Sequence, residues 1–148
     1  MDSPRPEPPR FPEVAAGDRL PELRHEVTQE SIDRFAVASL DVNPVHIDPA
    51  WCARARVFDE EPVLHGMASM ALMTSVVLRA WGPTAQIRSI DSKFTKPTPV
   101  GRSLTISGRV TEAHHIAPGR NYVVVGVKAV DEDGDTVGVS QIEVGLPD

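Results

Sequence analysis

The chain of 148 residues contains one cysteine, Cys52, so no disulfide can form within it. Disulfides are rare in reducing compartments, and we therefore expect a cytoplasmic protein. A secretory signal peptide is not predicted, because the N-terminus carries prolines and charges where an apolar stretch would be needed. The longest uncharged helical run, residues 66–78, is too short for a bilayer, which takes roughly 20 residues. No contact with a membrane is predicted.

Basic residues do not outnumber acidic residues in this chain. The formal net charge is −6 and the sequence pI is about 5.3. These values argue against a nucleic-acid partner, which would require a basic face. They do not exclude an anionic substrate, since a local basic rim can override the net charge. Five basic residues are candidates for such a rim: Arg54, Arg56, Lys93, Lys96 and Arg102.

The first 17 residues differ in composition from the rest. Residues 1–17 hold five prolines among charges, which predicts a flexible or extended N-terminal arm. Residues 18–148 are then one domain of ordinary size, with the 41% hydrophobic content of a soluble globular protein.

Cys52 has no histidine beside it in sequence, so we expect a small buried apolar role and not a nucleophile.

Hydrophobic periodicity predicts helices first and strands afterwards. Helices are expected over 29–39, from Pro49 to Ala53 or Ala55, and over 65–82, the last of which is apolar nearly all round. Strands are expected over 18–27, 86–94, 103–111, 121–130 and 136–144. Antiparallel strands beside segregated helices indicate an α+β fold, with the sheet curved around the long apolar helix.

Two segments contain residue types that can bind metals, but their spacing does not fit a metal site. Residues 131–135 contain four acidic residues and an Asp-Gly pair, which predicts a hairpin turn; the spacing does not fit a calcium loop. His114 and His115 are expected in a loop, without a cysteine or acid spaced to complete a metal site. We therefore predict no metal.

The stretch Ser39–Asp48 is the best candidate for chemistry. It places Asp41 five residues before His46, with Asn43 and Pro44 forming a rigid turn between them. A short turn that fixes a carboxylate and an imidazole can aim an acid/base pair at one point. The alternative is a capped turn next to a structural histidine.

Three sequence blocks resemble the MaoC-like (R)-specific enoyl-CoA hydratases. They are the motif from Phe35 to Asp48, the block Pro62-Val63-Leu64-His65-Gly66-Met67, and the block Phe94-Thr95-Lys96-Pro97 with Val100-Gly101. The resemblance implies a hot-dog fold, an antiparallel sheet wrapped around one long central helix, and a homodimer. It also implies addition of water to an enoyl thioester of CoA or acyl carrier protein, or the reverse reaction, without a cofactor.

The same resemblance assigns roles to residues. Asp41 and His46 would be catalytic, and the backbone N–H of Gly66 would donate to the thioester oxygen. Asn43 would shape the turn and reach the site, and Thr74 would place a hydroxyl near the water. Leu40 departs from the pattern, because many relatives have glycine before the aspartate.

The sequence suggests a structural role for His65 and leaves two alternative functions of the chain open. His65 is expected to have a structural role at the start of the long helix, where the helix dipole disfavours a charged imidazole. A hot-dog thioesterase would need a carboxylate on or near the central helix, and residues 66–78 contain none. The chain could also be a non-catalytic subunit that completes a heterodimer.

Overall fold

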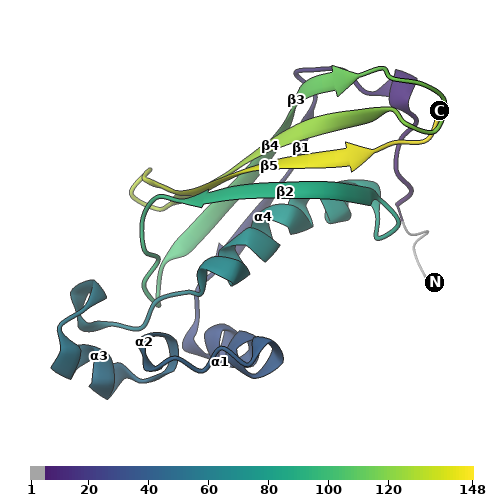
Figure 1. Cartoon of the computed structure of the whole chain (residues 1–148). Coiled ribbons are helices and arrows are strands. Elements are labelled where there is room, and N and C mark those ends of the chain that lie inside the picture. Colours follow the sequence, from purple (N-terminus) through teal and green to yellow (C-terminus); the bar gives the residue numbers. More distant parts are fainter. Residues whose placement is uncertain (1–5) are drawn as a thin grey trace, which may run out of the picture.

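Five antiparallel strands wrap around one long helix in the computed structural model, which describes residues 6–148 (Figure 1). The strand order is β1-β3-β4-β5-β2, which leaves β1 and β2 at the two edges. The strands are β1 (Arg19–Glu26), β2 (Gln86–Phe94), β3 (Ser103–His114), β4 (Tyr122–Asp131) and β5 (Thr136–Gly145). The helices are α1 (Gln29–Ser39), α2 (Pro44–Ile47), α3 (Pro49–Ala55) and α4 (Gly66–Trp81), with 3-10 turns η1 (Phe11–Glu13) and η2 (Phe58–Glu60). The predicted hot-dog architecture is confirmed.

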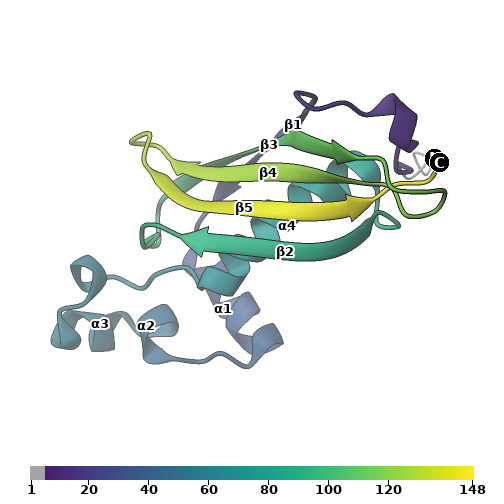
Figure 2. The ribbon, with the colours of Figure 1, turned by 45° about the horizontal axis from the view of Figure 1, so that its top comes forward.

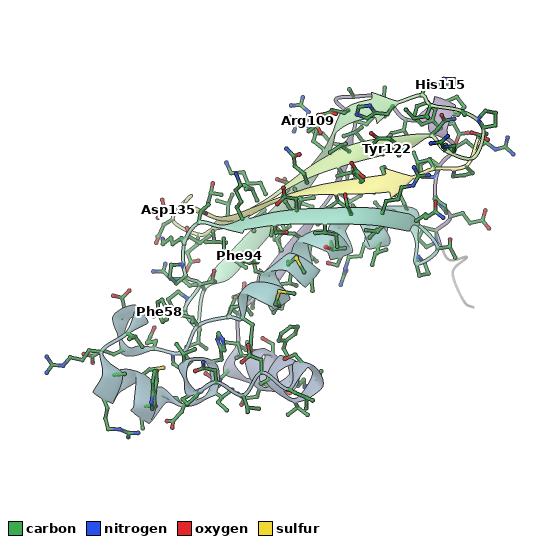
Figure 3. All side chains as sticks on the ribbon, in the orientation of Figure 1. Phe58, Phe94, Arg109, His115, Tyr122 and Asp135 are labelled. Atoms are coloured by element: carbon green, nitrogen blue, oxygen red, sulfur yellow. The ribbon has the colours of Figure 1, made fainter. Side chains whose placement is uncertain are left out.

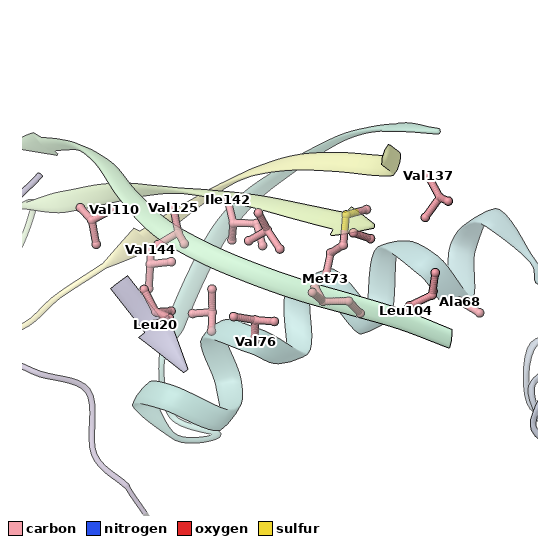
Figure 4. Close-up of a cluster of buried hydrophobic side chains, with 14 of the residues drawn as sticks. Leu20, Ala68, Met73, Val76, Leu104, Val110, Val125, Val137, Ile142 and Val144 are labelled. Carbon is pink, nitrogen blue, oxygen red and sulfur yellow. The ribbon is translucent and has the colours of Figure 1, made fainter. Parts of the chain in front are cut away.

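The core lies between α4 and the inner face of the sheet. Figure 4 shows Met73 and Val76 of α4 among strand residues such as Val125 and Ile142, and all four side chains are buried. On β3 the predicted alternation holds, because Leu104, Ile106 and Val110 are all buried. Gly108 lies between them, and a Cβ there would stand 3.0 Å from Val76 Cγ1. The missing side chain therefore lets helix and sheet approach closely.

The burial of α4 is one-sided. Met73 and Val77 are fully buried, whereas Met67 is 57% exposed and Ala71 is exposed as well. The sequence predicted burial on most sides of this helix. A single curved sheet covers one side only, so part of an apolar helix stays open in the single chain.

The helices α1, α2 and α3 form a lobe beyond one end of the sheet, next to the start of α4 (Figures 1 and 2). Thr28 caps α1 by accepting a hydrogen bond from the Ser31 N–H. The sequence predicted a rigid turn at Asn43 and Pro44. No helix continues from α1 into Pro44, because Asn43 has a non-helical ψ of 131°. Pro44 is instead the first residue of the short separate helix α2, which the sequence did not predict, and Asn43 is its N-cap. Proline is favoured there since the N–H it lacks is one that the first helical turn leaves unpaired.

Several elements run past their predicted ends. β3 continues to His114, so this histidine lies in a strand and not in a loop; it contacts Glu112 at 2.6 Å and stacks on Tyr122.

The acidic turn does join β4 to β5 as a hairpin, with the Asp131 N–H donating to the Asp135 carbonyl. Among the described residues, no helix is long and apolar enough to cross a membrane.

The predicted N-terminal arm is described from residue 6 onward, and residues 1–5 lie outside the described part. The Phe11 N–H donates to the Pro147 carbonyl, and the Gly17 N–H donates to the Val110 carbonyl, each over 2.7 Å. A Cβ on Gly82, whose φ is +84°, would collide with the Pro6 carbonyl oxygen. These contacts tie residues 6–17 to the domain, and the boundary at residue 17 stays a prediction.

We expect Leu40→Asn to stabilise the protein. Leu40 ends α1 in the left-handed conformation, with φ 62°, while 84% exposed. That conformation costs a leucine about 1–2 kcal/mol, whereas asparagine adopts it readily. The free energy of unfolding in urea should therefore rise by about 0.5–1 kcal/mol.

The matched control is Val37→Asn. Val37 is 73% exposed within α1, and valine and asparagine have similar helix propensities. Its substitution should change the free energy of unfolding by less than about 0.5 kcal/mol. An equal effect of the two substitutions would show that the conformation of Leu40 is not the cause.

Candidate active site

The segment Pro62–Leu64 fixes the lobe against the start of α4. The Val63 N–H donates to the Val45 carbonyl of α2 over 3.2 Å. On the other side, the Leu64 N–H donates to the Thr98 carbonyl over 2.8 Å. The chain from the lobe into α4 is thus held between α2 and the β2–β3 connection, so that α2 has a defined position relative to Gly66.

Asp41 and His46 converge, as the sequence predicted. His46 Nε2 lies 3.8 Å from Asp41 Oδ2. The imidazole is mostly buried, with 14% of its side chain exposed, while the carboxylate is 51% exposed. The separation is too long for a direct hydrogen bond. A water oxygen can nevertheless stand at hydrogen-bonding distance from both groups.

Hydrogen bonding determines which nitrogen of His46 is free. His46 Nδ1 lies 2.7 Å from the Val63 carbonyl oxygen, which can only accept, so Nδ1 carries the proton in the neutral ring. Nε2 is then left with its lone pair facing the Asp41 carboxylate. Two acceptors that face each other favour a hydrogen-bond donor between them, such as a water molecule or a hydroxyl group.

A third side chain joins this pair. His65 is 1% exposed, and its ring stacks on that of His46 with a centroid distance of 3.8 Å and an interplanar angle of 24°. Its Nε2 lies 2.9 Å from the Asp41 backbone carbonyl, and its Nδ1 is buried with no hydrogen-bond partner among the described residues. The sequence placed His65 at the helix start but did not connect it with Asp41 and His46. Sequence spacing does not indicate this contact, because 24 residues separate His65 from Asp41.

Asp41, His46 and His65 also satisfy the geometry of a potential metal-binding group. One ligand atom from each lies within 4.8 Å of the others. Each histidine, however, points one ring nitrogen at a backbone carbonyl, so only one nitrogen per ring is left for a ligand. The sequence-based expectation of no metal stays a prediction.

Gly66 opens α4 beside a hollow of about 290 Å³. The hollow is lined by Phe58 of η2 and Phe94 of β2, whose places are labelled in Figure 3. Gly66 has the first N–H of the helix, a group that has no partner within the helix itself. A Cβ at this position would stand 3.2 Å from the Phe94 ring, so glycine keeps the backbone accessible.

Comparison with known proteins places this geometry in a family. The MaoC like domain model matches residues 11–133, and so covers most of the chain. The chain belongs to the MaoC-like family.

Named relatives of this MaoC-like chain act on acyl thioesters. It is 34% identical over 104 residues to 3-hydroxyacyl-thioester dehydratase Y of Mycobacterium tuberculosis, covering 68% of this chain and 34% of that protein. The chain therefore spans about a third of that relative's length. It is 30% identical over 120 residues to the (R)-specific enoyl-CoA hydratase of Rhodospirillum rubrum, covering 78% of this chain and 81% of the relative.

Solved structures agree with this placement. The unliganded R-hydratase PhaJ1 from Pseudomonas aeruginosa superposes with a TM-score of 0.81 at 26% identity, covering 94% of this chain and 86% of PhaJ1. Both the fold and the family predicted from the sequence are thus confirmed.

The remaining predicted site residues of the MaoC-like chain have other visible contacts. Asn43 accepts a hydrogen bond from the Val45 N–H and so caps α2. Thr74 is buried, and its hydroxyl donates to the Met70 carbonyl over 2.9 Å. It lies eight residues beyond Gly66, or about 12 Å along the helix axis. Roles for Asn43 and Thr74 in substrate binding stay predictions.

Two members of the predicted basic rim are already paired. Lys96 contacts Asp131 and Asp135 at 2.8 and 2.7 Å, and Arg102 contacts Asp133 at 2.8 Å. The hydrogen bond to Asp131 raises the pKa of Lys96, and the bond from Lys96 lowers the pKa of Asp131. The acidic hairpin, marked by Asp135 in Figure 3, therefore neutralises Lys96 and Arg102.

The other rim candidates divide between α3 and the sheet. Arg54 and Arg56 are exposed on and after α3. Lys93 lines a larger hollow of about 630 Å³ on the sheet, together with Arg109 and Lys128. That hollow includes none of the predicted site residues, whereas the smaller hollow includes Gly66, so the size of the larger one does not make it the catalytic site.

Cys52 has the buried role expected from the sequence. It is fully buried, and desolvation raises the pKa of its thiol, with the nearby Asp48 carboxylate adding to the effect. A raised pKa disfavours the thiolate that a nucleophile would need.

The pairing of Lys96 with Asp131 predicts a pH-dependent effect of Lys96→Met. The pKa of Asp131 is lowered in the folded state, so its contribution to stability is present above the unfolded value of about 3.8 and is lost as pH falls through the folded value. Lys96→Met should therefore lower the free energy of unfolding at neutral pH. The difference from the unsubstituted protein should shrink as the pH falls below about 3.8.

Urea unfolding at several pH values measures this difference. The control is Lys128→Met, because Lys128 is exposed and forms no ion pair within the described chain. A Lys96→Met effect that is independent of pH, or equal to that of the control, would contradict the assignment.

Proposed function

We propose that this chain catalyses the reversible hydration of enoyl thioesters to (R)-3-hydroxyacyl thioesters. The observation that carries the proposal is the pair of acceptors, His46 Nε2 and the Asp41 carboxylate, 3.8 Å apart. The His46 ring stacks on His65, the residue that precedes the first N–H of α4. The activities named for the two curated relatives support the same reaction class.

In the hydration direction, a water held between His46 and Asp41 attacks C3 of the enoyl thioester. One proton leaves the water for the pair as the C3–O bond forms. A proton from the pair reaches C2, so the enzyme ends each turnover in its starting protonation state. The two groups act as a coupled unit, and histidine is well suited to exchange protons near neutral pH.

Negative charge develops on the thioester oxygen during this reaction. We assign its stabilisation to the Gly66 N–H, a donor without a partner in its own helix, at the positive end of the α4 dipole. In this proposal the acyl group enters the hollow between Phe58 and Phe94, which adjoins Gly66. Thr74 and Asn43 complete the substrate-binding residues.

The thioester carrier is CoA or acyl carrier protein, and the working form is a homodimer in the cytoplasm. The open side of α4 around Met67 and the exposed apolar residues Ile90 and Phe94 of the edge strand β2 support pairing with a second copy. The free, buried Cys52 suits a reducing compartment.

Loss of either catalytic group should abolish turnover. We expect Asp41→Asn and His46→Ala each to lower kcat/KM by about 10²–10⁴-fold, the range that general acid–base catalysis supplies. The measurement is the fall in conjugated-enoyl absorbance when enoyl-CoA or enoyl-carrier-protein substrates of several chain lengths are added.

The matched controls for these substitutions are Asp59→Asn and His115→Ala, at exposed positions where the rate should not change. Asparagine suits position 59, because Asp59 has a φ of 60°. If the unsubstituted protein were inactive on every substrate, the proposal would fail. Release of free thiol from a saturated acyl-CoA would favour a thioesterase, and activity only after adding a second subunit would favour the heterodimer.

The role of the Gly66 N–H can be tested without breaking α4. Proline is favoured at the first helical position, and His65 precedes it with φ −59° and ψ 136°, a conformation compatible with a following proline. Gly66→Pro removes the N–H, whereas Gly66→Ala keeps it and adds the bulk of a Cβ. We expect Gly66→Pro to lower kcat about 10²–10³-fold relative to Gly66→Ala. Equal rates for the two variants would exclude this donor.

A further inference from the structure

His65 contacts both members of the proposed catalytic pair. It donates from Nε2 to the Asp41 backbone carbonyl over 2.9 Å and stacks on the His46 ring at 3.8 Å. We propose that His65 is the positioning residue that sets the distance between His46 Nε2 and the Asp41 carboxylate. This inference rests on the proposed function, because it concerns the geometry of the same site.

The backbone at Asp41 needs such a restraint. Asp41 follows Leu40, which is left-handed and exposed, and its own side chain is 51% exposed. Within the described chain, the other hydrogen bonds of Asp41 are local and long, with the Ser39 hydroxyl at 3.3 Å and the Asn43 N–H at 3.4 Å. The bond from His65 is shorter and joins this loop to the start of α4. It therefore anchors Asp41 to the element that also provides Gly66.

The ring of His46 is restrained by the same side chain. Its edge is fixed by the bond from Nδ1 to the Val63 carbonyl, and its face is covered by His65. His65 in turn packs against Phe35 of α1, with ring centroids 4.8 Å apart. The imidazole of His46 thus cannot tilt without displacing a fully buried neighbour.

The protonation of His65 suits a positioning role and not proton transfer. Because Nε2 faces a carbonyl oxygen, it carries the proton of the neutral ring. Nδ1 is buried, and residues 6–148 offer it no hydrogen-bond partner, so a second proton there would have no acceptor among them. His65 therefore stays a hydrogen-bond donor through Nε2, and His46 is left as the histidine that exchanges protons.

A purely structural capping role fits these contacts less well. His65 occupies the N-cap position of α4, yet its side chain makes no capping hydrogen bond to the helix. Its one side-chain hydrogen bond within the described chain goes to the catalytic loop instead. The side chain thus stabilises the position of Asp41 and not the end of the helix.

Three substitutions separate the hydrogen bond from the packing. His65→Gln places an amide N–H near the position of Nε2 and keeps the donor to Asp41. His65→Asn has the same amide on a shorter side chain that cannot reach, and His65→Phe keeps the ring stack without a donor. We expect kcat to fall about 10–100-fold in His65→Asn and His65→Phe, with KM changed less than about twofold, because small misplacements of reacting groups lower rates by such factors. His65→Gln should recover most of kcat.

Two kinetic results would contradict a positioning role of the His65 hydrogen bond. Similar kcat values for all three variants, or a His65→Phe rate within twofold of the unsubstituted protein, would show that the hydrogen bond does not position Asp41. Thermal unfolding of each variant separates loss of fold from loss of geometry, since the rates are compared per folded molecule.

A second measurement does not depend on activity. Imidazole ¹⁵N NMR of the unsubstituted protein should show His65 protonated at Nε2 and His46 protonated at Nδ1. In His65→Phe, but not in His65→Gln, the loop at Asp41 should be released, so that the amide signals of residues 40–43 shift or broaden. Finding His65 protonated at Nδ1, or unchanged loop signals in His65→Phe, would contradict the inference even if no thioester were turned over. Inactivity of the unsubstituted protein with the expected NMR signals would instead count against the proposed function alone.

Discussion

The backbone N–H and carbonyl of Val63 join the lobe to the segment that leads into α4. Its N–H binds the Val45 carbonyl of α2, and its carbonyl binds Nδ1 of His46. One residue thereby fixes both the position of the short helix and the tautomer of the imidazole that the helix presents. Because Leu64 is bound to Thr98, the same segment also relates the lobe to the sheet. Asp41 and His46 are therefore held by backbone hydrogen bonds more than by contact between their own side chains.

Much of the fold was predictable from the sequence because local signals agreed with the tertiary structure. The Thr28 cap and the apolar spacing that follows gave the bounds of α1, and strict alternation gave the buried face of β3. The pairing of Asp41 with His46 was also predictable, since both lie in one short stretch. His65 was not, because its importance comes from a stack and a hydrogen bond across 24 residues, and spacing in sequence does not report such contacts.

The predicted basic rim shows a second limit of sequence reasoning. Lys96 and Arg102 lie next to the family motif, so they were reasonable candidates to receive an anionic carrier. The fold brings the hairpin Asp131–Asp135 against them, and its carboxylates occupy both side chains. A basic residue can be assigned to a ligand only when the acidic residues that pack beside it are known. The helix α2 is a milder case, because the turn predicted at Asn43 and Pro44 did not reveal the short helix that Pro44 begins.

The open side of α4 bears on how stability should be described for this protein. An apolar helix covered by a sheet on one side only leaves part of its hydrophobic burial to be completed by another surface. If that surface is a second copy of the chain, folding and association are thermodynamically linked. The midpoint of unfolding would then rise with protein concentration, and a free energy of unfolding would have meaning only at a stated concentration.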